Sequence, residues 1–464
     1  MCPQITKISM CPQITMSKRK KIVLVTLASI AVLVLLFIGW HYIRFLKATS
    51  RMKVLSADLD KRVTEWEKKE YKRQPLFGQI IKGNAAEFYQ EAESKIEDTS
   101  PDGWREVADT VYYHPGSISP TGKVCYEKNK PLIEIVRKGT RADTYKSLLN
   151  PRAGFHAKTP NLLNPRNIAN LMDLQARELD NAGQTSEAIK ELCDIIQFGD
   201  DHFYYGSLIS AMLGIAVSAI GQEEIYRFIV SDKLTEPQLN ELLGYLKTLI
   251  DSYPTIDDSW EGEIIAGGFG LKNLSEKSGF WFMPYEEVFT HQQNDFNGKI
   301  RFMFTYGWIN RTDIINASDD YTAFIGEMKR INAMPYPQAK AEKDKFDNTV
   351  KQLNNYVSRM MLQNISGGVI SYFDNLAIRK GLYILTALQI YKIRHGAYPE
   401  TLATLAPEII PDVTLDPFSG KSFIYRLDKD NKILLYSISY NFKDNNGSRQ
   451  EDLIIAPNFR GYRK

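Results

Sequence analysis

Residues 203–222 read FYYGSLISAMLGIAVSAIGQ, an uncharged stretch long enough for a membrane span or for the central helix of a folded body. Glycine and serine dilute its hydrophobicity at Gly206, Ser207, Ser210, Gly214, Ser218 and Gly221. Its flanks are acidic, at residues 200–201 and 223–224, whereas spans are usually anchored by Lys and Arg. We therefore predict a buried core helix here, around which the body packs.

A second apolar stretch, near the N-terminus, has the opposite character. It begins at Ile22, ends at Trp40 and contains no charge, and at 1.5 Å per residue it nearly crosses a hydrocarbon core of about 30 Å. Basic residues 18–21 precede it, and the aromatic side chains expected at an interface are Trp40, Tyr42 and Phe45. We predict a transmembrane helix at residues 22–40, with the membrane as its partner; a cleaved signal peptide is the alternative.

The segment before this span, residues 1–21, is interpreted as a leader followed by a basic cytoplasmic tail. Residues 1–6, MCPQIT, recur as residues 10–15, which indicates a duplicated leader and a second start at Met16. Because Arg44, Lys47, Arg51 and Lys53 follow the span, charge bias alone does not determine orientation. The short basic N-terminus favours a cytoplasmic tail and a body outside the cytoplasm.

The composition is that of a globular protein: 464 residues, 44% hydrophobic and 24% charged. The formal net charge is +3, but residues 1–53 hold nine of the 58 Lys and Arg and none of the 55 Asp and Glu. The rest of the chain therefore carries 49 basic against 55 acidic residues. A net acidic body argues against nucleic acid as a partner.

Helical periodicity dominates the middle of the chain. We predict a helical stalk at residues 41–75 that lifts the body off the membrane, and an all-helical body at residues 76–362. Proline, glycine and serine crowd residues 100–123, which predicts a long loop, and a further helical period covers residues 285–303.

One helix pair in this body has the spacing of a tetratricopeptide unit. The small and apolar positions that match are Ala176, Leu179, Gly183, Ala188, Leu192 and Ile195. No second copy is found in register, and repeat arrays need about three copies for stability. An ordinary helical hairpin within a larger bundle is therefore favoured over a repeat module.

Motifs for catalysis are sparse. Gly268-Phe269-Gly270 lacks the third glycine and the preceding strand of a dinucleotide fingerprint, and no histidine lies at metal-ligand spacing. Glu261 and Glu263, beside Trp260, are weak candidates for acid and base chemistry, which requires environments that separate their pKa values. Two cysteines of the body, at positions 125 and 193, leave open a disulfide between them.

The last hundred residues carry the most specific pattern. A long helical period from Ile365 stops at residues 395–399, HGAYP, where glycine caps the helix and proline prevents its continuation. Two runs of period two, at residues 422–427 and 433–439, predict a hairpin, and a last strand is expected at residues 453–456. We predict an α+β module at residues 363–464, made of a long helix and a small antiparallel sheet.

The segment of residues 387–426 resembles the globular part of the major pseudopilin of type II secretion systems. The matching positions are Tyr391, Gly396, Tyr398, Pro399, Leu402, Leu405, Asp416, Pro417, Phe418 and Tyr425. The resemblance implies the fold of the module, a bacterial envelope location and partners in secretion or surface assembly. The anchor lacks the G-F-T-L-x-E peptidase site of that family, so the resemblance does not imply polymerisation into a pseudopilus.

The tail beyond the hairpin resembles the loop that binds calcium in those pseudopilins. This resemblance implies oxygen ligands from Ser439, Asn441, Asp444, Asn445 and Asp452, of which Asp444, Asn445 and Asp452 are the metal candidates. A solvated turn at residues 445–447 needs no metal and is the favoured interpretation. No other cofactor is expected.

Together these patterns predict a mainly α protein with a C-terminal α+β module, held in the bacterial inner membrane by one helix, its N-terminus cytoplasmic and its body periplasmic. The favoured function is an envelope scaffold or interaction protein linked to secretion-like assembly, without catalysis. One alternative is an envelope hydrolase whose acids come from separate helices of the body. Another is a tetratricopeptide-like module that binds peptides in an open groove around Leu174 and Ile195.

Overall fold

The computed structural model describes residues 18–97, 101–112, 118–157, 161–278, 311–362, 367–429 and 431–457. Within these ranges the chain is mostly helical, with two three-stranded sheets. The predicted leader repeat, the Met16 start and the helical period at residues 285–303 lie outside the described residues.

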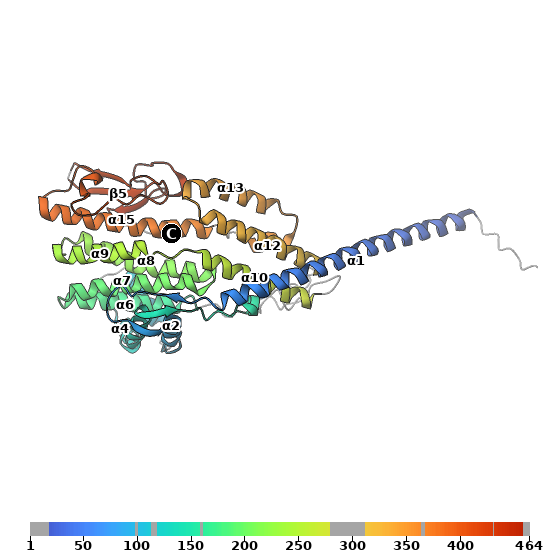
Figure 1. Cartoon of the computed structure of the whole chain (residues 1–464), viewed down its shortest axis with the longest axis horizontal. Coiled ribbons are helices and arrows are strands. Elements are labelled where there is room, and N and C mark those ends of the chain that lie inside the picture. The colour runs from blue at the N-terminus through green and yellow to red at the C-terminus, as the bar shows by residue number, and fades with distance from the viewer. Residues whose placement is uncertain are drawn as a thin grey trace, which may run out of the picture.

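The helices and strands, with Figure 1 showing their arrangement, are α1 (Lys18–Trp66), β1 (Tyr71–Lys72), β2 (Ile81–Asn84), α2 (Ala85–Ser94), α3 (Pro101–Tyr112), α4 (Pro120–Asn129), α5 (Pro131–Thr140), β3 (Ala142–Tyr145), η1 (Pro151–His156), α6 (Asn164–Asn181), α7 (Thr185–Asp201), η2 (His202–Tyr205), α8 (Leu208–Val230), α9 (Glu236–Asp251), α10 (Asp257–Lys277), α12 (Arg311–Asn332), α13 (Tyr336–Gln352), α14 (Tyr356–Leu362), α15 (Gly367–His395), η4 (Leu402–Leu405), β4 (Ile424–Leu427), β5 (Ile433–Ser437), η5 (Ser439–Asn441) and β6 (Leu453–Ala456).

Two described helices are long and apolar enough to cross a membrane, and they differ in burial. The apolar window of α1 has a mean hydropathy of 3.0 and none of it is buried, and Figure 1 shows this end of α1 projecting from the body. The window of α8 has a mean hydropathy of 1.3 and is 67% buried. The prediction that residues 203–222 form a core helix is therefore confirmed, and α1 is the candidate membrane span.

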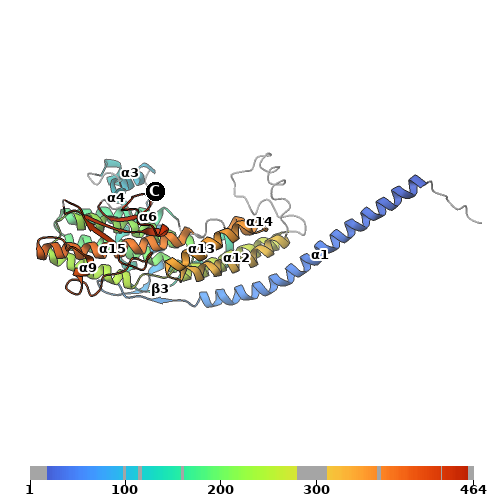
Figure 2. The ribbon, with the colours of Figure 1, turned by 90° about the horizontal axis from the view of Figure 1, so that it is seen from above.

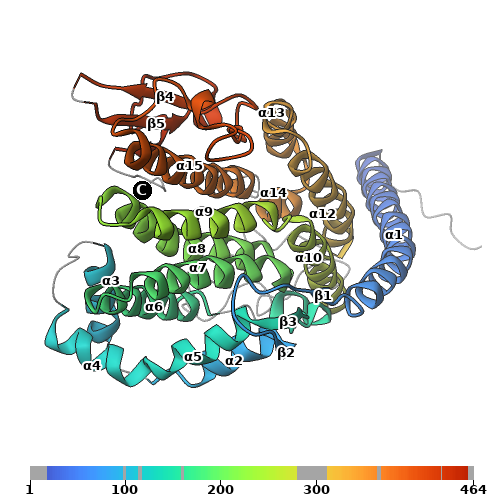
Figure 3. The ribbon, with the colours of Figure 1, turned by 60° about the vertical axis from the view of Figure 1, so that its left-hand side comes forward.

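The body is a stack of helices built around α8. α7 and α15 both pack on α8, α6 packs on α7 and α8, and α9 runs along α15 (Figure 3). Buried side chains from α2 to β6 form one continuous cluster. The helices and the C-terminal sheet therefore share a single core.

A buried ion pair joins four of these helices at the centre. Arg379 of α15 is 0% exposed and donates to both carboxylate oxygens of Asp200 on α7, at 2.7 and 2.8 Å. It also donates to the Leu249 carbonyl of α9 at 3.0 Å and to the Ser218 hydroxyl of α8 at 3.1 Å. Its guanidinium lies 4.7 Å from the centre of the Tyr253 ring. One side chain thus fixes the relative positions of α7, α8, α9 and α15.

The C-terminal elements follow their predicted pattern. α15 ends at His395, and Gly396 adopts a left-handed backbone with φ of 80°. β4 and β5 form the predicted antiparallel hairpin, and β6 adds to it in the order β4-β5-β6. The last strand has the predicted bounds. Its four residues are all apolar and all buried, since β6 lies between β5 and α15.

Three expectations for the body are wrong. It is not all-helical, since β2 and β3 pair in parallel and β1 adds antiparallel to β3. These strands are too short for a periodic signal, and their partners are distant in sequence. Residues 100–123 are not one long loop: α3 and α4 lie there, because proline at a first helical position starts a helix.

The third correction concerns the stalk expected at residues 41–75. α1 continues without a break from the apolar stretch to Trp66, and its last turns pack against α10 and α12 instead of standing free. The apolar positions that lie on one face of this part of the helix meet apolar faces of the body, so docking buries surface that a free stalk would expose.

The helix pair with tetratricopeptide spacing lies inside the bundle. α6 and α7 form a hairpin with Gly183 in the left-handed conformation at the turn, while α3 packs against α6 and α8 against α7. Cys125 of α4 and Cys193 of α7 are both buried and are not joined to each other, so the disulfide left open by the sequence is not formed.

Replacing Arg379 by Met should lower the free energy of unfolding by about 3–5 kcal/mol, because Asp200 is left as an uncompensated buried charge. The double variant Arg379→Met, Asp200→Leu should recover most of this loss, since both charges are removed. Urea unfolding of the full chain in detergent measures both effects. Lys340→Met, which removes an exposed ion pair with Asp344, is the matched control and should change little. A double variant no more stable than the single one would contradict this account.

Candidate functional site

Three helices meet where the apolar stretch of α1 gives way to the body. We call the assembly of α1 from Arg44 onward, α10 and α12 the neck. Lys69, near the end of α1, pairs with Asp258 in the first turn of α10 at 2.7 Å, so α10 runs antiparallel to α1. α12 begins beside Phe45 and runs parallel to α1, as Figure 2 shows.

Two apolar contacts hold the neck together. Leu59, Val63 and Trp66 of α1 form a buried cluster with Ile265 and Phe269 of α10. Nearer the apolar stretch, two residues of α1, at positions 48 and 52, form a second buried cluster with residue 315 of α12. α1 therefore joins the body along several turns, which prevents it from acting as a flexible tether.

Glycines of α10 allow this close approach. A side-chain methyl at Gly268 would collide with Leu59 of α1, and one at Gly267 would collide with the Tyr321 ring of α12. At Gly262 it would overlap the backbone carbonyl of Gly206. The glycine pair at positions 268 and 270, which superficially matched a dinucleotide motif, lies inside a helix and serves helix packing.

Glu261 lies at the centre of the neck. Its carboxylate accepts from Arg62 of α1 at 2.7 Å and from Lys329 of α12 at 3.3 Å. The three side chains border a cavity of about 400 Å3 whose other lining residues are mostly charged side chains of α1. Glu261 thus connects the three helices by ion pairs.

Glu263 occupies a different environment two residues further along α10. It is buried, accepts from the Tyr321 hydroxyl at 2.9 Å and from the backbone N–H of Leu208 at 3.4 Å, and burial raises its pKa. Residues two apart on a helix point about 200° from each other. The structure therefore separates Glu261 from Glu263, and they do not form the acid and base pair considered from the sequence.

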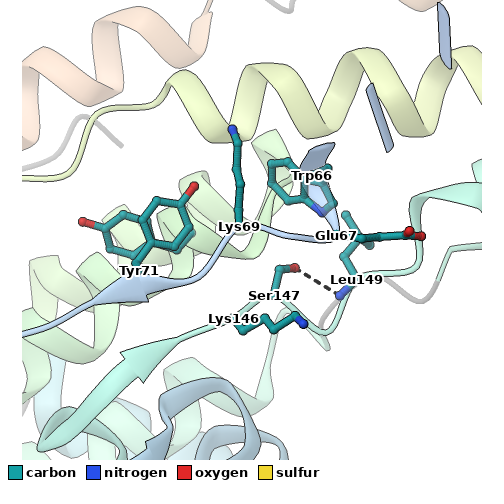
Figure 4. Close-up of a pocket in the computed structure, with 8 residues that line it drawn as sticks. Trp66, Glu67, Lys69, Tyr71, Lys146, Ser147 and Leu149 are labelled. Carbon is teal, nitrogen blue, oxygen red and sulfur yellow. Dashed lines mark hydrogen bonds between the residues drawn. The ribbon is translucent and has the colours of Figure 1, made fainter. Parts of the chain in front are cut away.

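A smaller cavity of about 170 Å3 lies beside the neck, where α1 ends (Figure 4). Trp66, Lys69, Tyr71 and Tyr204 line it, with the two tyrosine rings 4.5 Å apart between centres. The hydroxyl of Ser147, also in the lining, donates to a backbone carbonyl. The described lining contains no histidine or cysteine to activate that hydroxyl, so the cavity has the chemistry of an aromatic and basic recess.

Carboxylates with raised pKa values do occur, but they lie inside the bundle. Burial raises the pKa of Asp173 to about 8, of Asp194 to about 7 and of Asp201 to about 6. Asp201 accepts from Arg73 at 2.6 Å and from Gln197 at 2.9 Å. None of the three acids lines either cavity described above. The sequence showed Asp201 only as a flanking acid, because burial of a charge leaves no local pattern.

His202 is buried beside these acids. Its Nδ1 lies 2.8 Å from the Phe198 carbonyl, and burial lowers its pKa to about 4. Its ring stacks on Tyr89 at 6.2 Å between centres. A neutral imidazole that donates to a carbonyl is a structural group of the core. Because protonating the buried ring is unfavourable, the free energy of unfolding depends on pH.

The acids proposed for calcium already have protein partners, Asp444 on the hairpin strands and Asp452 within the loop. Asp444 pairs with Arg426 at 2.8 Å and accepts from the Tyr436 hydroxyl at 2.6 Å. Asp452 accepts from two backbone N–H groups, of residues 447 and 448, at 2.9 and 3.1 Å. Within the described residues no group of three or more His, Cys, Asp or Glu could hold a metal ion. The calcium site at Asp444, Asn445 and Asp452 stays a prediction of the resemblance.

Comparison of the chain with protein-family models, with curated proteins and with solved structures found no match. Fold and neck define the class: a mostly helical protein with a small C-terminal antiparallel sheet, whose long N-terminal helix is apolar enough to cross a membrane and continues into the body.

Replacing Gly262 by Ala should destabilise the protein by about 1–3 kcal/mol, because the added methyl overlaps a backbone carbonyl that cannot rotate away. The matched control is Gly326→Ala on α12, where a methyl meets open space and better helix propensity adds up to about 1 kcal/mol. Thermal unfolding of both full-length variants measures the difference. Equal melting temperatures would show that α10 does not need the glycine.

The pKa of His202 predicts a pH effect with a defined sign. The unfolded histidine binds a proton below about pH 6.5, whereas the folded one does so only near pH 4. Stability conferred by the neutral ring is therefore lost as pH falls from 6.5 to 4. Relative to His202→Phe, the wild type should lose about 2 kcal/mol between pH 7 and pH 5 in urea unfolding. A parallel loss in both proteins would assign the pH dependence to other groups.

Proposed function

We propose that the protein is a membrane-anchored scaffold or interaction protein of the bacterial envelope, held by a single span at residues 22–40. The observation that supports this most directly is the course of α1, whose apolar part is exposed while its later turns are buried in the neck. An exposed apolar surface of this length is unfavourable in water and favourable in a bilayer. A helix shared by span and body would hold the body at a fixed place on the membrane.

The orientation we propose puts residues 1–21 in the cytoplasm and the body in the periplasm. The basic residues 18–21 support it, because short basic segments are retained on the cytoplasmic side. Because α1 would cross the membrane and then continue into the body, the neck and the body would lie on the same side of the membrane. We propose an uncleaved anchor, since the docked part of α1 lies directly after the span.

A role in assembly is favoured over hydrolysis. The two acids that could have served a hydrolase lie on different sides of α10, each with its own partners. The C-terminal sheet forms the outermost layer over α15 (Figure 3), where a partner has access to it. Together with the pseudopilin resemblance of residues 387–426, this supports a partner in secretion-like assembly.

Cysteine labelling of intact spheroplasts tests this proposal, in a chain with Cys2 and Cys11 replaced by Ser. Val54→Cys lies beyond the span at a position that is 73% exposed in the wild type, and Lys18→Cys lies before the span. A membrane-impermeant maleimide should label Val54→Cys in intact spheroplasts, and Lys18→Cys only after lysis. The reverse pattern would contradict the orientation, and release of the chain by alkaline carbonate would contradict the anchor.

A further inference from the structure

We infer that the membrane-facing end of the neck binds anionic phospholipid headgroups through a basic collar made of Arg44 and Lys47 of α1 and Arg311 of α12. The body would then lie against the bilayer instead of standing above it. The inference rests on the proposed insertion of residues 22–40, and it adds a lipid contact made by the body itself.

The depth of the collar follows from helix geometry. The apolar stretch ends at Trp40, and Phe45 lies five residues further, or about 7.5 Å along the helix axis. The guanidinium of Arg311 lies 5.6 Å from the centre of the Phe45 ring. Headgroups extend about 5–7 Å beyond each side of the hydrocarbon core. Arg311, the first residue of α12, is therefore at the outer edge of the headgroup layer.

Along α1 the charge at this depth is of one sign, while α12 adds one acid, Asp313, in its first turn. Counting from Lys18, the first acidic residue of α1 is Asp58. Arg51, the next basic residue along α1 after Lys47, forms an ion pair with Asp319 of α12 inside the neck. By contrast, among the described acidic side chains none forms an ion pair with the three collar residues.

Each collar residue keeps its charge available to an anion. Lys47 is exposed, and Arg44 lies 4.7 Å from the centre of the Trp40 ring, a cation–π contact that leaves its charge uncompensated. Arg311 is half-buried, and its Nε has no hydrogen-bond partner among the described atoms. A guanidinium in this state favours a bidentate oxyanion partner.

Lipid phosphate is the partner that this position selects. The collar surrounds a helix that enters the bilayer, so phosphate groups are the anions present at its depth. Attraction to a net negative headgroup falls off within a Debye length of about 10 Å in 0.1 M salt, which includes the collar and excludes the far end of the neck. Phosphatidylglycerol should therefore be preferred over zwitterionic phosphatidylcholine.

Spin-label spectroscopy of the full-length protein in phosphatidylcholine vesicles tests the inference. Trace spin-labelled phosphatidylglycerol or phosphatidylcholine reports the fraction of lipid immobilised by the protein. We expect phosphatidylglycerol to be preferred about two- to fivefold at low salt, and this ratio to fall in 1 M salt. The triple variant Arg44→Gln, Lys47→Gln, Arg311→Gln should lose at least half of the excess of immobilised phosphatidylglycerol over phosphatidylcholine. Residues 18–21 on the other flank contribute equally to all variants.

The single variant Arg311→Gln tests the contribution of the body apart from that of α1, because Arg311 is the collar residue that α12 supplies. It should lower the preference, whereas Arg311→Lys, which keeps the charge, should retain it. The matched control is Lys61→Gln, Lys68→Gln. It removes one exposed charge about 30 Å beyond Trp40 on α1 and a second just after the end of that helix, and it should leave the ratio unchanged.

The outcomes distinguish this inference from the proposed function. Protein washed from the vesicles by alkaline carbonate would overturn both. Protein that stays inserted, with a wild-type lipid preference in the triple variant, would overturn the collar alone. A loss of preference in the triple variant but not in Arg311→Gln would show that the body does not reach the headgroups, which also overturns the inference.

Discussion

The ion pair between Arg379 and Asp200 is the interaction on which the arrangement of the body depends. Two charges withdrawn from water are costly unless both are paired and hydrogen-bonded. Arg379 of α15 meets this requirement only when the four helices stand in one arrangement, since α7, α8 and α9 each contribute an acceptor. Apolar packing alone tolerates sliding of one helix along another, whereas a buried guanidinium with fixed acceptors does not. The pair thus favours one register of the four helices.

The neck extends this order toward the apolar end of α1. α10 contacts α1 and α12 through glycine positions that permit close approach, and Glu261 binds a cation from each of these helices. Apolar contacts bury one face of α1 between Ala48 and Trp66. The apolar stretch and the body are therefore joined by one continuous, docked helix, which fixes the direction in which the stretch leaves the body.

The interior of the bundle contains more charge than a simple helical core needs. Asp173, Asp194 and Asp201 are buried with raised pKa values, and His202 is buried with a lowered one. Such shifts are common at catalytic sites, but there they accompany access for a substrate. Here Asp194 accepts from Thr140 of α5 and Asp201 from Tyr89 of α2, and neither described cavity reaches the four groups. The shifts are better explained as the cost of specifying how the helices pack.

The sequence alone determined the features whose physical cause is local. Acidic flanks and diluting glycines marked residues 203–222 as a core helix, an uninterrupted apolar run marked residues 22–40 as a candidate span, and Gly396 marked the end of α15. Turn residues between two alternating runs placed the hairpin of β4 and β5. The tertiary structure decided what depends on contacts between distant residues. Asp200 and Arg379 are 179 positions apart, and Arg62 and Glu261 are 199 apart, so no spacing rule connects them. The same reason explains why the predicted stalk packs on the body and why Glu261 and Glu263 have different partners. Both depend on how whole helices pack, which a local sequence pattern does not encode.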